Sequence, residues 1–301
     1  MASTLITVAD TTARDALSPA VGDTVYQIDN KKINVCASLG PVVWKTYDSE
    51  GAAYQDSDVT DLSPHLWLDA QNGDFYTDAA KGTAVTLDGR LVGCWADRSG
   101  NSFDFAQTAI GQKPNIFTNI GTTNLTGLQM TTDTLKITGT SSSEVASDCT
   151  VFMAHKLALH GQYLIMTTDS KTRIRMVLSG ETAYFQCLPF AGSPTFATAT
   201  SQAIADALTS DICLIGIRKD TTANTTEVFL NGGSADASST AGSDSFLTDG
   251  VTLEYPDDGG GEGPNIAFEM IVFNSALSDA NMNTIYDYLS LKHGTTVTAV
   301  S

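Results

Sequence analysis

The sequence predicts an all-β fold, a β-sandwich of the jelly-roll type with one amphipathic helix near its C-terminus and a small β module before it. Short runs of β-branched and aromatic residues recur between clusters of Gly, Asn, Asp, Ser and Thr, which is typical of strands joined by turns. Several runs alternate apolar and polar residues with the period of a strand. One clear helical period begins after Ser278.

The first 50 residues are predicted to form a small β attachment module. Strands are expected at Thr24–Ile28, Ile33–Cys36 and Val42–Tyr47, and the polar residues Asp29–Lys31 form the first turn. A unit of this size buries too little apolar surface to be stable alone, so it must dock on the rest of the chain, a second copy or a larger assembly. The residues expected to make this contact are Val25, Tyr26, Ile28, Ile33 and Trp44.

Residues 51–61 are polar, acidic and poor in large aliphatic side chains, and they are predicted to be a linker. Residues 62–301 are predicted to be the sandwich. In Arg173–Leu178 the apolar residues alternate, so one face is buried and the arginines point away. Thr150–Ala154 and Met270–Phe273 are apolar on both faces, which predicts central strands covered on both sides. The strand candidates are Thr134–Thr138, Thr150–His155, Tyr163–Thr167, Arg173–Leu178, Ala183–Cys187, Ile212–Arg218, Glu227–Leu230 and Ile266–Phe273.

A hairpin and a helix are predicted in the last third of the sandwich. Asn231 and Gly232 follow a predicted strand, and both tolerate the positive φ that a hairpin turn requires. Ser278 is a suitable N-cap for a helix, and Gly294 is a suitable residue to end it. The helix has a single apolar stripe, with Lys292 and His293 in its last turn, and the stripe consists of Met282, Ile285, Tyr286 and Leu289.

The charge of the chain restricts its partners. The formal net charge is −18 and the sequence pI is about 4.3, so nucleic acid and anionic membranes are not expected to bind. No run approaches the roughly 20 apolar residues that a spanning helix needs, and no signal peptide is evident at the N-terminus.

The cysteines indicate a reducing compartment. The chain has five of them, widely spaced and without a CxxC pair. Several lie inside apolar strand runs, as Cys213 does, so they are expected to be buried free thiols that pack as small apolar side chains. Synthesis in a cytosol fits this better than secretion.

Both ends of the predicted sandwich resemble the concanavalin A-like, laminin-G-type domain family. The opening "L-x-x-W-L-D-A" pattern is matched by Leu62, Pro64, Leu66, Trp67, Leu68, Asp69 and Ala70. The "v-x-x-W-x-D-x-S-G-N-x-x-d-f" segment is matched by Val92, Trp95, Asp97, Ser99, Gly100, Asn101, Asp104 and Phe105. The later matches are Pro114, Val228, Leu230, Asn231, Gly232, Ile266, Glu269, Ile271, Val272, Phe273, Asn274, Leu277, Ser278, Asp279, Ile285, Tyr288, Leu289, Lys292 and Gly294.

The N-terminal module has a resemblance of its own, to the short N-terminal modules of bacteriophage fibre and surface proteins. The residues that carry it are Pro19, Gly22, Asp23, Val25, Tyr26, Asp29, Lys31, Ile33 and Trp44. Together the two resemblances imply a phage virion surface protein with a concanavalin A-like sandwich. The fold by itself implies no single function, since it occurs in lectins, glycosidases, adhesins and virion proteins.

Enzymatic activity is not expected. A retaining glycosidase on this fold needs two carboxylates about 5 Å apart, which an E-x-D-x-x-E strand supplies, and no such pattern occurs. The four histidines lack zinc spacing, and the sequence has no Gly-x-Ser-x-Gly, Walker or dinucleotide motif. No cofactor is predicted. Calcium remains an alternative, with ligands from Asp257, Asp258 and Glu262 or from Asp74 and Asp78.

Glycan recognition is the alternative role of the sandwich. Trp67 and Trp95 could stack on sugar rings, but their place in the structural motifs favours core packing. Asp69, Asp97 and Asn101 are interpreted as turn-fixing groups. The predicted recognition loop lies at the rim of the sandwich, where such folds place binding sites, and contains Tyr255, Asp257, Asp258 and Glu262.

The sequence therefore favours a structural bacteriophage protein, a capsid decoration or short fibre protein made in the host cytoplasm and displayed on the virion surface. Its N-terminal module would bind capsid or tail proteins, and copies would form a homo-oligomer, with a trimer favoured. The alternatives are a lectin-like tail fibre protein that recognises host surface glycans and a bacterial adhesin module.

Overall fold

The computed structural model describes residues 55–118, 125–129, 148–156, 212–236 and 266–301 with their side chains, and the backbone of the other strands named below. The chain divides into two compact units, Met1–Asp56 and Ser57–Ser301. The boundary falls within the segment predicted to be a linker. Part of that segment is a short helix, α2 (Asp56–Thr60), whose Val59 is fully buried.

The N-terminal unit contains a four-stranded sheet in the order β1-β2-β3-β4. Its strands are β1 (Leu5–Val8), β2 (Thr24–Gln27), β3 (Lys32–Leu39) and β4 (Val42–Asp48). The three predicted strands are confirmed as β2, β3 and β4, whereas β1, which pairs with β2 in parallel, was not predicted. Tyr26 is the cross-strand partner of Ile33, and Trp44 that of Cys36. Ile28 lies outside the described residues.

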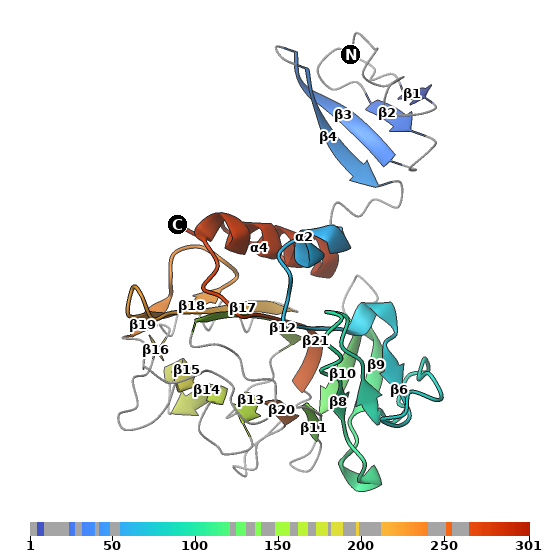
Figure 1. Ribbon diagram of the computed structural model, residues 1–301, viewed down its shortest axis with the longest axis vertical. Coiled ribbons are helices and arrows are strands. Elements are labelled where there is room, and N and C mark those ends of the chain that lie inside the picture. Colours follow the sequence, from blue (N-terminus) through green and yellow to red (C-terminus); the bar gives the residue numbers. More distant parts are fainter. Residues whose placement is uncertain are drawn as a thin grey trace. The chain divides into compact units, whose positions relative to one another are not determined.

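The second unit is a sandwich of two antiparallel sheets with a helix on one of them (Figure 1). The eight-stranded sheet has the order β19-β18-β17-β12-β21-β10-β9, and β5 also pairs with β21. Its strands are β5 (Leu66–Asp69), β9 (Asn115–Ile120), β10 (Leu125–Met130), β12 (Cys149–Lys156), β17 (Cys213–Asp220), β18 (Thr225–Leu230), β19 (Ala237–Ser239) and β21 (Asn265–Phe273).

The nine-stranded sheet has the order β16-β15-β14-β13-β20-β11-β8-β7-β6. Its strands are β6 (Phe75–Tyr76), β7 (Cys94–Trp95), β8 (Phe105–Ala106), β11 (Lys136–Gly139), β13 (Gln162–Thr167), β14 (Arg173–Ser179), β15 (Thr182–Leu188), β16 (Ala197–Thr198) and β20 (Val251–Glu254). Two 3-10 helices, η1 (Ala70–Asn72) and η2 (Ile110–Gln112), lie in the connections. This is the concanavalin A-like β-sandwich that the sequence predicted.

The predicted central strands are confirmed. β12 lies between β17 and β21 in the middle of the eight-stranded sheet, and seven of its eight residues are buried. Phe152 of β12 is fully buried and packs edge-to-face on Phe273 and on Tyr286 of the C-terminal helix. Because this sheet has the helix on one face and the second sheet on the other, both faces of β12 must be apolar.

The C-terminal helix α4 (Asp279–His293) is also confirmed with its caps. The Ser278 hydroxyl accepts from the Asn281 N–H, and Gly294 adopts the left-handed conformation with φ of 69°. The helix lies close on the sheet because Gly216 of β17 leaves room for Tyr286, whose hydroxyl donates to the Phe229 carbonyl at 3.2 Å.

The predicted turn after β18 has the positive φ expected of it. Asn231 and Gly232 have φ of 56° and 78°, and the residues after them lead into β19. The turn also holds the C-terminal segment, since Gly233 N–H donates to Thr298 O at 2.8 Å and Thr298 N–H donates to Asn231 O at 3.0 Å. No described helix is long and apolar enough to cross a membrane.

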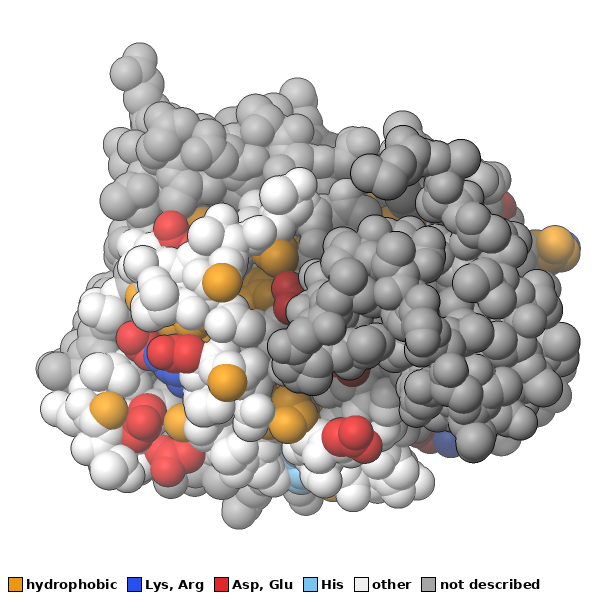
Figure 2. All heavy atoms as spheres, turned by 90° about the horizontal axis from the view of Figure 1, so that it is seen from above, with side chains coloured by type: hydrophobic (Ala, Val, Ile, Leu, Met, Phe, Trp, Pro, Cys, Tyr) orange, Lys and Arg blue, Asp and Glu red, His pale blue; other side chains and the backbone are white. Residues whose placement is uncertain are grey.

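Acidic side chains occur at several places on the described part of the face shown in Figure 2, and basic ones at few. This agrees with the formal net charge of −18.

Candidate functional site

The predicted recognition loop cannot be placed. Tyr255, Asp257, Asp258 and Glu262 lie outside the described residues. The calcium ligands suggested in that loop lie outside them as well.

The two tryptophans in the resemblance motifs are core residues, as predicted. Trp67 in β5 is 1% exposed and Trp95 in β7 is fully buried, so neither presents a face on which a sugar ring could stack. Trp95 packs on Phe75 with the ring centroids 5.2 Å apart. Their contribution is apolar packing.

Asp97 fixes the loop that follows β7, which confirms its interpretation as a turn-fixing residue. Its Oδ1 accepts from the N–H groups of Trp67 and Ser99, each at 2.9 Å, and its Oδ2 accepts from the Ser99 hydroxyl at 2.7 Å and the Phe103 N–H at 3.0 Å. The bond from the Trp67 N–H thereby attaches the loop to β5, the first strand of the sandwich. The bond from the Ser99 hydroxyl holds that side chain in place.

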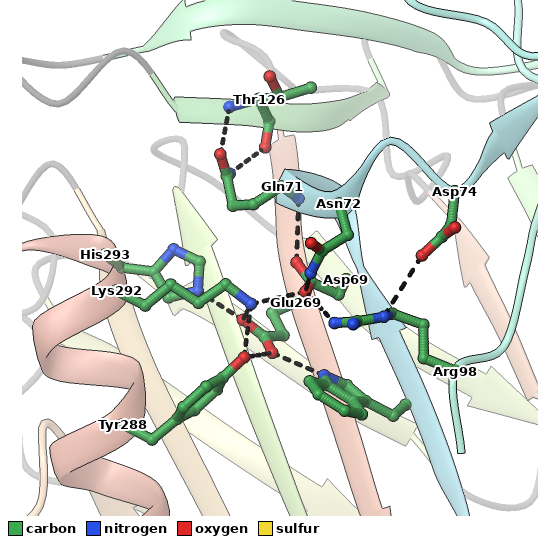
Figure 3. Close-up of polar contacts among 11 residues, drawn as sticks. Asp69, Gln71, Asn72, Asp74, Arg98, Thr126, Glu269, Tyr288, Lys292 and His293 are labelled. Atoms are coloured by element: carbon green, nitrogen blue, oxygen red, sulfur yellow. Dashed lines mark hydrogen bonds and ion pairs between the residues drawn. The ribbon is translucent and has the colours of Figure 1, made fainter. Parts of the chain in front are cut away.

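A group of charged side chains lies buried where α4 meets β5 and β21 (Figure 3). Asp69 ends β5, Glu269 is its cross-strand partner in β21, and Lys292 comes from the last turn of α4. Lys292 Nζ is 2.7 Å from Asp69 Oδ2 and 2.9 Å from Glu269 Oε2. We call the following residues the charge cluster: Trp67, Asp69, Arg98, Glu269, Tyr288, Lys292 and His293.

Glu269 is satisfied by hydrogen bonds on both oxygens. Its Oε1 accepts from the Trp67 indole N–H at 2.7 Å and from the Tyr288 hydroxyl at 2.8 Å, and its Oε2 lies 2.9 Å from His293 Nε2. Burial alone would raise the pKa of Glu269, but Lys292 and His293 outweigh it and lower the pKa to about 2. The side chain is therefore a carboxylate at neutral pH.

Asp69 does more than fix a turn, which adds to its predicted role. Its Oδ1 accepts from the Gln71 N–H at 2.9 Å as the N-cap of η1, and its Oδ2 accepts from the Asn72 amide and lies 2.7 Å from Arg98 Nη1. Burial and the charge of Glu269 raise its pKa, against the opposing effect of Lys292 and Arg98.

The two carboxylates of the charge cluster, with Lys292 and His293, are closed to ligands. Asp69 and Glu269 are fully buried, and Lys292 and His293 are 7% and 2% exposed. A glycosidase requires two carboxylates that a sugar can reach, and Asp69 and Glu269 are closed to solvent. The cluster holds the first strand, the last strand and the last helix of the sandwich together.

A polar hollow of about 370 Å³ opens at the other end of β5, where β21 ends. We call it the His65 pocket. It is lined by Thr60, Ser63, Pro64, His65, Ser99, Asn101 and Asn274. These residues come from the turn after α2, the loop that Asp97 fixes and the end of β21, so hydroxyl, amide and imidazole groups from three segments converge there.

Hydrogen bonds hold the walls of the His65 pocket. The amide of Asn101 donates to the His65 carbonyl at 2.9 Å, and the Ser99 hydroxyl donates to the same carbonyl at 3.1 Å. The Asn274 amide lies 2.9 Å from His65 Nδ1. Asn101 and Asn274 are exposed, and the Oδ1 of Asn101 has no hydrogen-bond partner among the described residues.

The imidazole of His65 packs on Phe103 in a tilted arrangement, with the ring centroids 4.7 Å apart. Its buried Nε2 has no partner among the described residues. Burial lowers the pKa of His65 from its ordinary value of 6.5, and the carboxylate of Asp97 opposes this. His65 is therefore neutral at pH 7, with one donor and one acceptor nitrogen, of which Nδ1 lies against Asn274.

We expect acid to weaken the fold through His65. Since its pKa is lower in the folded chain than in the unfolded chain, the unfolded state takes up the proton first, and stability falls as the pH drops below 6.5. Urea unfolding midpoints of the wild type and of His65→Gln, measured between pH 7 and 5, check this. We expect the urea midpoint of the wild type to fall modestly between pH 7 and 5, and that of His65→Gln to fall less. An equal loss in both would assign the effect to other groups.

A second hollow, of about 540 Å³, is lined mainly by residues 83–91 together with Thr77, Ile110 and Lys113. Its apolar side chains are exposed, Leu87 by 61% and Ile110 by 74%. Its lining also includes the charged side chains of Arg90 and Lys113, which distinguishes it from the His65 pocket.

The described residues contain no group of three His, Cys, Asp or Glu side chains that could hold a metal ion. Asp74 lies 3.5 Å from Arg98 Nε, and Asp78 accepts from the Ala80 N–H at 3.0 Å, so these suggested calcium ligands serve an ion pair and a turn. The cysteines with described side chains, Cys94, Cys149 and Cys213, are buried free thiols, as predicted. Burial raises the pKa of Cys94 to about 11 and of Cys213 to about 12, so both remain protonated.

These features define a concanavalin A-like sandwich with a closed charge cluster and an open polar pocket. No protein-family model matches the sequence, and no curated protein matches it. Among solved structures the chain is similar to the binding domain of botulinum neurotoxin serotype D, at 12% identity and a TM-score of 0.51, over 77% of this chain and 52% of that one.

Two further structures are similar to this chain. The binding domain of Paraclostridial Mosquitocidal Protein 1 has 11% identity and a TM-score of 0.51, over 66% of this chain and 50% of that one. The receptor binding domain of the botulinum neurotoxin C/D mosaic serotype has 11% identity and a TM-score of 0.52, over 76% and 52%. The chain thus spans about half the length of the structures it matches. At such identities the likeness establishes the fold.

Proposed function

We propose that the chain is a non-catalytic recognition protein that binds a surface glycan in the His65 pocket. The observation that carries this proposal is the convergence of hydroxyl, amide and imidazole groups on one open hollow at the end of the central strands. Loops at the end of a rigid sandwich commonly carry binding sites. The binding and receptor binding domains with the same fold support the proposal.

The chemistry of the pocket favours an uncharged, hydroxyl-rich ligand. Amide groups such as those of Asn101 and Asn274 both donate and accept hydrogen bonds, which suits sugar hydroxyls. Among the described residues, no Lys, Arg, Asp or Glu lines the pocket. A pocket of this size holds one or two sugar units of a longer glycan at its end.

Several features argue against catalysis. The facing carboxylates Asp69 and Glu269 are closed to solvent, and the sequence lacks the paired-carboxylate strand of glycosidases on this fold. The described thiols are protonated at neutral pH, which makes them poor nucleophiles.

A glycan array probed with the full chain tests the proposal. We expect one class of glycans to bind, and Asn274→Ala to raise the Kd about three- to tenfold, because one neutral hydrogen bond contributes about 0.5–1.5 kcal/mol. The matched control is Gln112→Ala. It deletes a side-chain amide in η2, which does not line the pocket. Equal affinities for both variants would place binding elsewhere, and no binding to any sugar would reject the proposal.

The N-terminal unit supports a second candidate function, display on the surface of a phage virion. The observation behind it is that Met1–Asp56 forms a compact unit with its own four-stranded sheet. A sheet of this size is stabilised by burying a face against a partner. We propose that this unit attaches the chain to capsid or tail proteins, in a homo-oligomer such as a trimer.

Cutting the chain near Asp56 tests attachment. The N-terminal piece should bind virus particles, and the Leu62–Ser301 fragment should not. The attachment hypothesis is wrong if the larger fragment binds particles and the N-terminal piece does not.

A further inference from the structure

The charge cluster brings together the groups needed to form an amide bond between two side chains. We propose that Lys292 and Asp69 become covalently joined after folding, through a bond between Lys292 Nζ and the side-chain carbonyl carbon of Asp69, with Glu269 carrying the protons. The bond would be a self-catalysed modification of the folded chain and is independent of the proposed glycan site.

Proximity is the first argument. Lys292 Nζ lies 2.7 Å from Asp69 Oδ2 and 2.9 Å from Glu269 Oε2, so nucleophile, electrophile and proton carrier are in contact. The cross-strand pairing of Asp69 with Glu269 and the seating of α4 fix this arrangement in the folded chain (Figure 3). Groups held at such distances react with effective molarities far above those in solution.

The carboxyl group of Asp69 is prepared for attack. Its Oδ2 accepts hydrogen bonds from the Arg98 guanidinium at 2.7 Å and from the Asn72 amide, and these donors would stabilise the negative charge that develops on this oxygen in a tetrahedral intermediate. The pKa of Asp69 is raised by burial and by Glu269, which weakens its preference for the charged form.

Burial supplies the driving force. Asp69 and Glu269 are fully buried, and Lys292 lies against the rings of Trp67 and Tyr288 at 6.0 and 4.9 Å. Two opposite charges held in a dry interior pay a large desolvation cost. An amide replaces Lys292 and Asp69 with a neutral group, the water leaves for the solvent, and Glu269 keeps its contacts with the Trp67 indole, the Tyr288 hydroxyl and His293.

The reaction balances without a co-reactant. Glu269 accepts one proton from the Lys292 ammonium group during the attack itself, against the raised pKa of Lys292 and the lowered pKa of Glu269, as Nζ forms the C–N bond to the Asp69 carbonyl carbon. Asp69 Oδ2 becomes the amide oxygen, and the C–Oδ1 bond breaks. Two of the three ammonium protons end on Oδ1, which leaves as water. Glu269 returns to its starting state, and no atom is oxidised or reduced.

The Tyr288 hydroxyl extends the proton path. It lies 2.5 Å from Lys292 Nζ and 2.8 Å from Glu269 Oε1, so it bridges the nucleophile and the proton carrier. The bond would join β5, the first strand of the sandwich, to α4, its last helix. A cross-link between positions so far apart in sequence strongly restricts the unfolded chain.

Mass spectrometry of the intact, denatured full chain tests the proposal. We expect a mass lower than that of the amino-acid sequence by one water molecule, and a tryptic digest in which the peptides containing Asp69 and Lys292 are joined and cleavage after Lys292 is blocked. A wild type with the full sequence mass and separate peptides would overturn the proposal, whether or not any variant folds.

Variants assign the roles. Lys292→Met and Glu269→Gln should each show the full mass of their sequences, and Lys81→Met, which removes a lysine from a surface ion pair, should still lack one water. Circular dichroism shows whether Glu269→Gln is folded. A folded Glu269→Gln that forms the bond at the wild-type rate would contradict the role of Glu269.

Discussion

Replacing Lys292 with methionine should lower the free energy of unfolding by about 3–5 kcal/mol, because it leaves the buried carboxylates of Asp69 and Glu269 without their shared cation. Urea unfolding measured by circular dichroism checks this. This loss in the free energy of unfolding is the one expected when Lys292 and Asp69 form an ion pair. It is larger when they are joined by an amide bond.

Lys81→Met is the matched control for this loss. Lys81 pairs with Asp104 at 2.6 Å, but its side chain is 39% exposed, so its removal should cost no more than about 1 kcal/mol. If both variants lost the same stability, the charge cluster would not hold the sandwich together in the way described.

Phe152→Ala is expected to destabilise the chain by about 3–5 kcal/mol, since it opens a cavity in the centre of the eight-stranded sheet. Its ring packs edge-to-face on Phe273 and Tyr286, so β21 and α4 lose contacts at the same point. The same unfolding experiment measures the loss. Leu291→Ala, a truncation on the exposed side of α4, should change stability by no more than about 0.5 kcal/mol. If Phe152→Ala and Leu291→Ala both had a small effect on stability, Phe152 would not be a central residue of the core.

The central strands and the C-terminal helix follow from local sequence signals. β12 and β21 were predicted as central strands because they are apolar on both faces, and α4 because its stripe and both caps agree. The short strands β6, β7, β8 and β16 were missed, since two residues are too few to show a period, and β9, β10, β19 and β20 were missed as well. β1 pairs in parallel with β2 across a long connection, and no local sequence signal predicts such a pairing.

The charge cluster shows where sequence reasoning fell short. Lys292 and His293 were placed in the last turn of the helix, but the sequence did not reveal that both are buried against Glu269. One signal was present. Glu269 is a single acidic residue within the apolar strand β21, and a charge in such a place requires a buried partner. Its partner lies on a different element, so its identity depends on tertiary packing.

The cluster also explains the resemblance motifs. Trp67, Asp69, Glu269, Tyr288 and Lys292 all belong to the matched patterns at the two ends of the sandwich, and they meet in one buried group. The likeness to the family therefore rests on residues that hold the fold together. The His65 pocket was not predicted, because its lining comes from three separate segments that only the fold brings together.

A crystal structure of the full chain soaked with the glycan selected on the array tests the central claim most directly. We predict a sugar in the His65 pocket, with its hydroxyls about 2.7–3.2 Å from the amide groups of Asn101 and Asn274. A sugar bound elsewhere, for example in the hollow beside Ile110, or an empty His65 pocket at saturating glycan, would contradict the proposed function.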